Sequence, residues 1–199
     1  MPPKSYKGIT FTGSTFPDSP YKTVLVKLNT TITNEYLPAL KLAFPAGPKG
    51  LQLLLTAMTH QEGFTKATRS YKNNNPGNIG NTDSGANNKL PTLKAGILLQ
   101  AKYVNDIIAG KNKNYPMGKP VVIPEFFSNE IAKNPQYGLN PNLPGYKFTF
   151  TGQLDQFVKI YSTGARATNS YLNIIVSYFK ANGLTITPAS TLQDIIRMN

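Results

Sequence analysis

The sequence predicts a mainly α (α+β) protein, in which a small β-containing N-terminal extension precedes a helical domain. From residue 48 onward, apolar residues recur every three or four positions in several stretches, which is the spacing of amphipathic helices. Residues 1–46 differ, because they contain two short alternating stretches rich in β-branched residues. A chain of 199 residues suits one compact domain with an extension. We therefore expect an extension over residues 1–46 and a domain over residues 47–199.

The extension contains two predicted strands and one predicted helix. Residues 6–12 and 23–28 alternate in the manner of strands. Residues 34–44 predict a short helix, provided that Pro38 lies in its first turn, where a proline is tolerated. Two roles are open for this extension: it anchors the protein to a particle or a cell wall, or it only covers part of the domain.

The first helix of the domain is predicted over residues 48–62, and it ends in a carboxylate. Pro48 suits a first helical turn, and Gly63 suits the position after the last turn. Four residues share the apolar face, namely Leu51, Leu54, Leu55 and Met58. The same face continues to Glu62, so we expect burial and the negative end of the helix dipole to raise the pKa of this carboxyl. A carboxylic acid that stays protonated near neutrality is what glycosidic bond cleavage needs. The alternative is an exposed glutamate at a helix end, and His60 is predicted on the surface.

An asparagine-rich loop follows this helix. Residues 75–78, Asn-Pro-Gly-Asn, have the composition of a type II turn, with proline second and glycine third. Amide side chains both donate and accept hydrogen bonds, as sugar hydroxyls and acetamido groups require. Residues 70–72 lead into this loop and extend the same surface. The alternative interpretation is an ordinary polar turn.

Further helices are predicted over residues 93–108, 153–162, 169–181 and 192–197. Residues 110–150 are rich in Pro, Gly, Asn and Lys and predict mostly irregular structure, with a short helix near residues 124–127. Long ordered loops often line clefts in enzymes. Two roles are therefore open for Tyr137, Tyr146 and Phe148, which either stack on sugars or pack at the edge of the core.

Residues 61–63, Gln-Glu-Gly, together with residues 69–80, Arg-Ser-Tyr-Lys-Asn-Asn-Asn-Pro-Gly-Asn-Ile-Gly, resemble the lysozyme-like muramidase and lytic transglycosylase domains common in bacteriophages. Residues 152–157 and 169–173 resemble the C-terminal helices of that group more loosely, so that the resemblance covers residues 48–199. It implies a lysozyme-like fold with Glu62 as the general acid. It also implies that Tyr161 approaches this glutamate.

Most glycosidases use a second carboxylate, and the chain offers few candidates. Asp83 follows the asparagine loop and is either a base in the cleft or a turn aspartate. Asp106, Glu125, Glu130 and Asp155 lack the geometry of a second catalytic group in the predicted elements. With Glu62 alone, the muramic 6-hydroxyl would close an anhydro ring, as in lytic transglycosylases. With Asp83 positioning water, the outcome would be hydrolysis, and the sequence leaves both open.

The composition favours an anionic partner. The formal net charge is +12 at pH 7, and the anionic polymers of a bacterial envelope and nucleic acid are the two obvious candidates. Only three residues are arginines, whose side chains dominate base recognition, and no nucleic-acid-binding motif is present. We therefore expect bacterial peptidoglycan as the partner, with other virion proteins as further candidates and no specific nucleic acid.

The composition also bounds the chemistry and the location. With one histidine and no cysteine, we expect no structural zinc site, no other metal and no cofactor. No apolar run is long enough to span a bilayer, and the first residues lack the apolar stretch of a signal peptide. We expect a protein that is carried in a phage virion, or made in the host cytoplasm and released to the periplasm and cell wall.

These observations predict an enzyme that cleaves the β-1,4 bond between N-acetylmuramic acid and N-acetylglucosamine. The candidate catalytic residues are Glu62 and Asp83. The candidate substrate-binding residues are Ser70, Tyr71, Asn73, Asn75, Asn78 and Tyr161. Three rivals stay open: a glucosaminidase, a virion structural protein with a glycan-binding but inactive domain of this type, and a basic nucleic-acid-binding protein.

Overall fold

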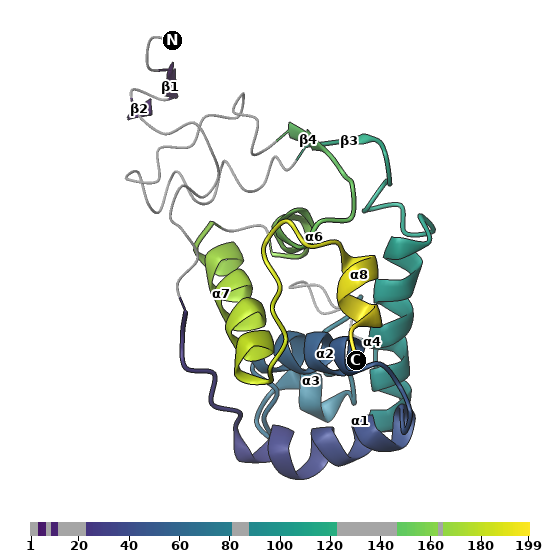
Figure 1. Cartoon of the computed structure of the whole chain (residues 1–199). Helices are drawn as coiled ribbons and strands as arrows, with labels where there is room; N and C mark the ends of the chain where they lie inside the picture. Colours follow the sequence, from purple (N-terminus) through teal and green to yellow (C-terminus); the bar gives the residue numbers. More distant parts are fainter. Residues whose placement is uncertain (1–3, 7–8, 12–22, 81–87, 123–146, 163–164) are drawn as a thin grey trace.

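The computed structural model describes residues 4–6, 9–11, 23–80, 88–122, 147–162 and 165–199. Helices dominate these residues, as Figure 1 shows, so the mainly α class is confirmed. Each of the two sheets consists of two short strands. No helix in the described parts of the chain is both long enough and apolar enough to cross a membrane.

The central element is α2, Lys49–Gln61, which lies in the middle of the helices in Figure 1. It packs against α7, Ala165–Ala181, and α8, Leu192–Arg197. The apolar face predicted from the sequence is buried, with Leu54, Leu55 and Met58 fully inaccessible to solvent. Each such side chain stabilises the fold by about 1.5–3 kcal/mol relative to an exposed position. The predicted helix over residues 48–62 is therefore confirmed.

The helix predicted over residues 34–44 is also present, but it begins earlier. A π-helical turn, η1 (Ile32–Tyr36), runs directly into α1 (Leu37–Ala43), and Pro38 lies in the first turn of α1 as expected. Ile32, Tyr36 and Leu40 are at most 2% exposed and belong to the same core as α2. The division into an extension and a domain at residues 46 and 47 stays a prediction.

The strands expected in the extension differ from the structure. One strand was expected over residues 6–12, whereas β1 (Lys4–Tyr6) and β2 (Ile9–Phe11) form a short antiparallel pair. The strand predicted over residues 23–28 is wrong, because this segment pairs with no strand in the described structure. The backbone N–H of Val24 instead donates to Ser177 Oγ on α7, at 2.9 Å. An alternating sequence forms a strand only where a partner strand satisfies its backbone groups.

The helix predicted over residues 93–108 is confirmed as α4, Leu93–Ile108. Thr92 caps it, since its hydroxyl accepts a hydrogen bond from the N–H of Ala95 at 3.1 Å. Gly96 permits close contact with the asparagine loop: a Cβ at this position would lie 1.7 Å from the carbonyl oxygen of Asn74. The start of α4 therefore supports the backbone of the loop directly.

The C-terminal part contains β3 (Pro120–Val122), β4 (Lys147–Thr149), α6 (Leu154–Tyr161), α7 and α8. The helices predicted over residues 153–162 and 192–197 are confirmed, and α7 begins four residues before the predicted position. The predicted irregular region 110–150 contains the antiparallel pair β3–β4. The helix expected near residues 124–127, and Tyr137 and Tyr146, lie outside the described residues. Phe148 lies on β4, with its ring 5.7 Å from the Lys159 ammonium.

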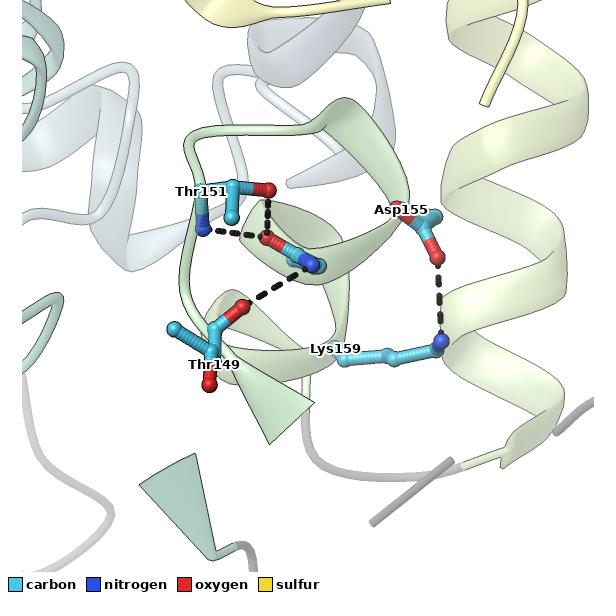
Figure 2. A network of polar contacts seen from close by, with 5 residues as sticks. Thr149, Thr151, Asp155 and Lys159 are labelled. Carbon is cyan, nitrogen blue, oxygen red and sulfur yellow. Dashed lines mark hydrogen bonds and ion pairs between the residues drawn. The ribbon is translucent and has the colours of Figure 1, made fainter. Parts of the chain in front are cut away.

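Side-chain bonds hold α6 at its start, as Figure 2 shows. The Gln156 amide accepts from the Thr151 backbone N–H at 2.7 Å and donates to the Thr149 carbonyl at 3.2 Å, so the end of β4 is tied to the helix. Asp155, in the first turn as predicted, accepts from Lys159 at 3.0 Å. These contacts fix the helix that carries Tyr161.

Candidate active site

A polar cleft of about 270 Å³ opens beside the end of α2. Four separate parts of the chain form it: the end of α2, the asparagine loop, α4 with the turn after it, and α6. Its lining residues are Glu62, Asn78, Ile79, Gly80, Tyr103, Asn114, Tyr115, Ile160 and Tyr161. Within the described residues, Glu62 is the one carboxylate among them.

The position of Glu62 follows from the way in which α2 ends. Its backbone N–H still donates to the carbonyl of Met58 at 3.0 Å, so Glu62 caps the last turn. Gly63 then adopts the left-handed conformation, with φ of 65°, as a glycine after a helix end commonly does. The glutamate is thereby placed at the helix C-terminus, on the continuation of the buried face, as the sequence predicts.

The surroundings of Glu62 favour its protonated form. Burial raises the pKa of this carboxyl, and this effect exceeds the opposing hydrogen bonds from Tyr171 and Asn78, which lower the pKa. The Tyr171 hydroxyl donates to Oε1 of Glu62. A carboxyl with a raised pKa keeps its proton to higher pH than an ordinary glutamate does, and the protonated form is the state that a general acid requires.

Four tyrosines from α4, the turn after it, α6 and α7 form a chain of ring contacts that ends at the carboxyl. The rings of Tyr161 and Tyr171 have centroids 5.5 Å apart, and those of Tyr103 and Tyr161 are 6.1 Å apart. The Tyr103 hydroxyl donates to that of Tyr115 at 3.1 Å. Burial raises the pKa of Tyr161 well above its usual value, and the negative charge of Glu62 raises this pKa further. These phenols therefore stay protonated and act as hydrogen-bond donors.

The Tyr161 hydroxyl donates to the carbonyl oxygen of Gly77. This bond joins α6 to the asparagine loop, and it places the loop residue Asn78 beside Glu62. Tyr161 lines the same cleft as Glu62, whose charge acts on its phenol, but the tyrosine that donates a hydrogen bond to Glu62 is Tyr171. Tyr161 holds the loop that faces the same carboxyl.

The asparagine loop turns as expected, but its turn is of another type. Asn78 N–H donates to the Asn75 carbonyl at 3.0 Å. In a type II turn over residues 75–78, Gly77 would adopt the left-handed conformation. The left-handed residue is instead Asn78, with φ of 52°. The glycine is needed for space instead, since a Cβ at Gly77 would lie 2.8 Å from Cγ of Gln100. The type II assignment is therefore wrong.

Several predicted contact residues lie in the loop and its lead-in but do not line the cleft. Asn75 is fully buried, and its amide is used within the loop, where it accepts from Ile79 N–H at 3.0 Å and donates to Ile79 O at 2.9 Å. The Ser70 hydroxyl is 3.0 Å from that of Thr68. The Tyr71 hydroxyl donates to Glu35 at 2.7 Å. These bonds give the three side chains structural roles.

Asn73 and Asp83 complete the set of predicted site residues. The Asn73 carbonyl accepts from Leu90 N–H at 2.8 Å, and its amide nitrogen is buried with no hydrogen-bond partner among the described residues. Asp83 lies outside the described residues. Of the predicted site residues, the cleft brings together Glu62, Asn78 and Tyr161.

His60 was expected on the surface, but it is half-buried. Burial lowers the pKa of its imidazole. Its Nδ1 atom is buried without a hydrogen-bond partner in the described structure. The position opposite the apolar stripe of α2 is therefore partly covered by other parts of the fold.

The other described carboxylates are engaged away from the cleft. Glu35 accepts from Tyr71 and pairs with Lys66 at 3.2 Å, and Asp106 pairs with Lys102. Asp194 accepts from the Thr191 hydroxyl at 2.6 Å at the start of α8. In the described part of the chain, no three histidine, aspartate or glutamate side chains gather closely enough to hold a metal ion.

No family model matches the sequence, and neither a curated protein nor a solved structure is significantly similar to it. The function must therefore be argued from the chemistry of the cleft and from the sequence motif that forms it.

Proposed function

We propose that this protein cleaves the β-1,4 bond between N-acetylmuramic acid and N-acetylglucosamine in peptidoglycan, with Glu62 as the general acid. The observation that carries the proposal is the environment of Glu62: it is a cleft carboxyl whose pKa is raised by burial and whose position is fixed by Tyr171 and Asn78. The proposal includes a lysozyme-like domain of phage origin, because the motif of Glu62 and the asparagine loop is typical of that group.

The lining of the cleft suits a glycan. Tyr103 and Tyr161 contribute aromatic rings to the lining, with the buried Tyr115 behind them, and Asn78 and Asn114 offer amides that both donate and accept. Sugar rings carry apolar faces as well as hydroxyl and acetamido groups, so both kinds of contact are useful. The net charge of +12 favours approach to the anionic polymers of a bacterial wall.

In the proposed reaction, Glu62 donates its proton to the glycosidic oxygen while the bond from that oxygen to the muramic C1 breaks. The leaving sugar departs as a free alcohol, and positive charge develops on the muramic ring. When the muramic 6-hydroxyl attacks C1, the Glu62 carboxylate accepts its proton and a 1,6-anhydro end forms. When water attacks C1 instead, Asp83 is the candidate base that accepts the proton, and the product is a reducing end.

The proposal is tested by the clearing of purified cell walls by wild type, Glu62→Gln and Glu35→Gln. We expect Glu62→Gln to lose about 10²–10⁴-fold in rate, as loss of a general acid generally costs. Glu35→Gln is the matched control, because Glu35 is a carboxylate bonded to a tyrosine outside the cleft. Equal activity of Glu62→Gln and wild type would refute the role of Glu62. Folded wild type that binds walls without cleaving them would favour a structural role in the virion.

A further inference from the structure

A second hollow lies beside the first half of α2 and shares no residue with the cleft. Its volume is about 370 Å³, which falls within the range of about 300–1,000 Å³ typical of small-molecule sites. Its floor is apolar and is formed mainly by Leu37, Leu40, Phe44 and Leu53 from α1, the following turn and α2. We call this hollow the α1–α2 groove.

The wall of the groove is held in place by the turn between its two helices. The Gln52 side-chain amide donates to the carbonyls of Phe44 at 3.3 Å and Gly47 at 3.1 Å. Leu40 and Leu53 are only 2% and 7% exposed, so the floor is part of the core. The groove is therefore formed before any ligand arrives, and binding needs little rearrangement.

Two lysines line the groove, and both carry uncompensated charge in the described structure. Lys41 belongs to α1 and Lys49 is the first residue of α2, and both are exposed. Neither forms an ion pair with a described carboxylate, whereas Lys66, Lys102 and Lys159 do. An apolar floor beside two cations complements a ligand that has an apolar body and an anionic head.

Tyr178 from α7 adds a further polar group to the groove. Burial raises the pKa of this phenol, so it is protonated and can donate a hydrogen bond. Its hydroxyl makes no hydrogen bond to another residue in the described ranges. A few polar groups that converge on an apolar cavity are the usual signature of a site that orients one ligand.

We propose that the α1–α2 groove binds a single-chain anionic amphiphile of the medium-chain fatty-acid class. The alkyl chain lies against the leucines and Phe44, and the carboxylate lies beside Lys41, Lys49 and the Tyr178 hydroxyl. A glycan would leave its hydroxyls unpaired on the apolar floor. A protein partner would need about 800 Å² of surface on each side, far more than this hollow provides. This site is separate from the proposed catalytic function, and its ligand does not depend on that function.

The test is titration of the full chain with dodecanoate below its micellar concentration, followed by calorimetry and by amide chemical shifts. Dodecyl maltoside is the neutral probe with the same chain. We expect saturable dodecanoate binding that perturbs Leu37, Leu53 and Tyr178. The double variant Lys41→Glu/Lys49→Glu should raise the Kd about tenfold or more, because two attractive contacts become repulsive. Lys119→Glu, an exposed lysine outside the groove, should leave the Kd unchanged.

Several results would overturn the proposal. One is the absence of saturable dodecanoate binding by wild type, and another is amide chemical-shift changes confined to the cleft residues Tyr103 and Tyr161. A third is equal dodecanoate affinity in the double variant and in Lys119→Glu. Equally tight binding of the neutral maltoside would remove the role of the lysines. Binding to phosphatidylglycerol vesicles without binding to monomeric dodecanoate would show that the groove contacts a membrane surface instead. Glu62→Gln should bind dodecanoate like wild type, so that failure of the catalytic proposal and failure of this one can be told apart.

Discussion

Two opposing effects determine the pKa of the Glu62 carboxyl. Burial raises its pKa, whereas the hydrogen bonds from Tyr171 and Asn78 lower it, and burial has the larger effect. The same tyrosine is itself almost fully buried, at 4% exposed, so its hydroxyl has a fixed direction. The ionisation of Glu62 should therefore affect the pH dependence of both stability and activity.

The stability of the fold should depend on the ionisation of Glu62. Its folded pKa lies above the value of about 4.3 expected in an unfolded chain. The stability linked to this group is therefore complete below about pH 4.3 and declines as the pH rises through the folded pKa. We expect the difference in unfolding free energy, wild type minus Glu62→Gln, to fall with rising pH. Urea unfolding at several pH values measures this difference.

Glu35 provides the control of opposite sign. Its hydrogen bond from Tyr71, and then that from Lys66, lowers the pKa of this carboxyl. Stability from Glu35 is therefore present above its unfolded pKa and is lost as the pH falls through the folded pKa. The difference between wild type and Glu35→Gln should increase with pH over the acid range. The same slope for both variants would contradict the two assigned environments.

The pH profile of activity should respond to Tyr171. Tyr171→Phe removes a donor that lowers the pKa of Glu62, so the basic limb of the profile should move to higher pH. The plateau rate should fall about ten- to a hundredfold, in proportion to a lost hydrogen bond to a charged group. Tyr71→Phe removes a tyrosine–carboxylate bond outside the cleft and should leave the limb in place. A shift of the basic limb of Tyr171→Phe to lower pH would refute this role.

The sequence could locate Glu62 but not its partners. Helical spacing alone places Glu62 on the buried face at the end of α2, because helix geometry is local. Tyr171 is separated from Glu62 by 109 positions, and its contact depends on how α7 crosses α2. Asn75 and Asn78 have the same side chain in the same loop, yet one is buried in the loop and the other lines the cleft. Only the path of the backbone distinguishes them.

The helices and the asparagine loop support one another through glycine contacts. The starts of α2 and α4 carry Gly50 and Gly96, and a Cβ at these positions would lie 1.9 Å from Ile195 O and 1.7 Å from Asn74 O. Neither glycine is required by its φ angle, since the left-handed glycines are at other positions. Both are required because a backbone passes directly against the helix.

The contact of Gly96 with the loop predicts that Gly96→Ala destabilises the protein, although Gly→Ala usually stabilises a helix. In an unobstructed helix, Gly→Ala stabilises by about 0.5–1 kcal/mol. At Gly96 we expect a loss of about 1–3 kcal/mol or more, because the new methyl group would displace the Asn74 carbonyl. Urea unfolding of Gly96→Ala measures this loss, with Asn105→Ala, an exposed position on α4, as the control. An increase in stability at Gly96 would show that the loop does not approach α4 as described.

Sequence patterns predicted the long helices well and the extended segments poorly. Residues 93–108 form a helix over the predicted range, since a helix satisfies its backbone hydrogen bonds within itself. Residues 23–28 have the pattern of a strand but no strand partner in the described structure. The type of the loop turn was misjudged because asparagine, like glycine, can take the left-handed conformation.

One buried polar group, Gln100 on α4, joins several distant parts of the fold. Its Oε1 accepts from the Tyr36 hydroxyl at 3.1 Å, and its Nε2 donates to Leu55 O and Thr59 Oγ1, each at 3.2 Å. The same side chain fills the space left by Gly77. Gln100 therefore connects η1, α2, α4 and the loop of the cleft. Such a junction depends on the crossing of elements that are distant in sequence, which no local pattern predicts.

Gln100→Leu should destabilise the protein by about 1–3 kcal/mol, because it leaves the buried Tyr36 hydroxyl without its acceptor. Tyr36→Phe should lower the free energy of unfolding less in the Gln100→Leu background than in wild type. This non-additivity is measured by a double-mutant cycle in urea. Fully additive losses would show that Tyr36 and Gln100 are not coupled.

The central claim is that Glu62 cleaves the bond on the reducing side of muramic acid. Mass spectrometry of the fragments released from purified peptidoglycan, by wild type and by Glu62→Gln at equal concentration of folded protein, tests this claim most directly. We predict fragments that end in muramic acid, reducing or 1,6-anhydro, and only with wild type. Fragments that end in reducing glucosamine, the same fragments from Glu62→Gln, or no fragments from wild type would contradict the account.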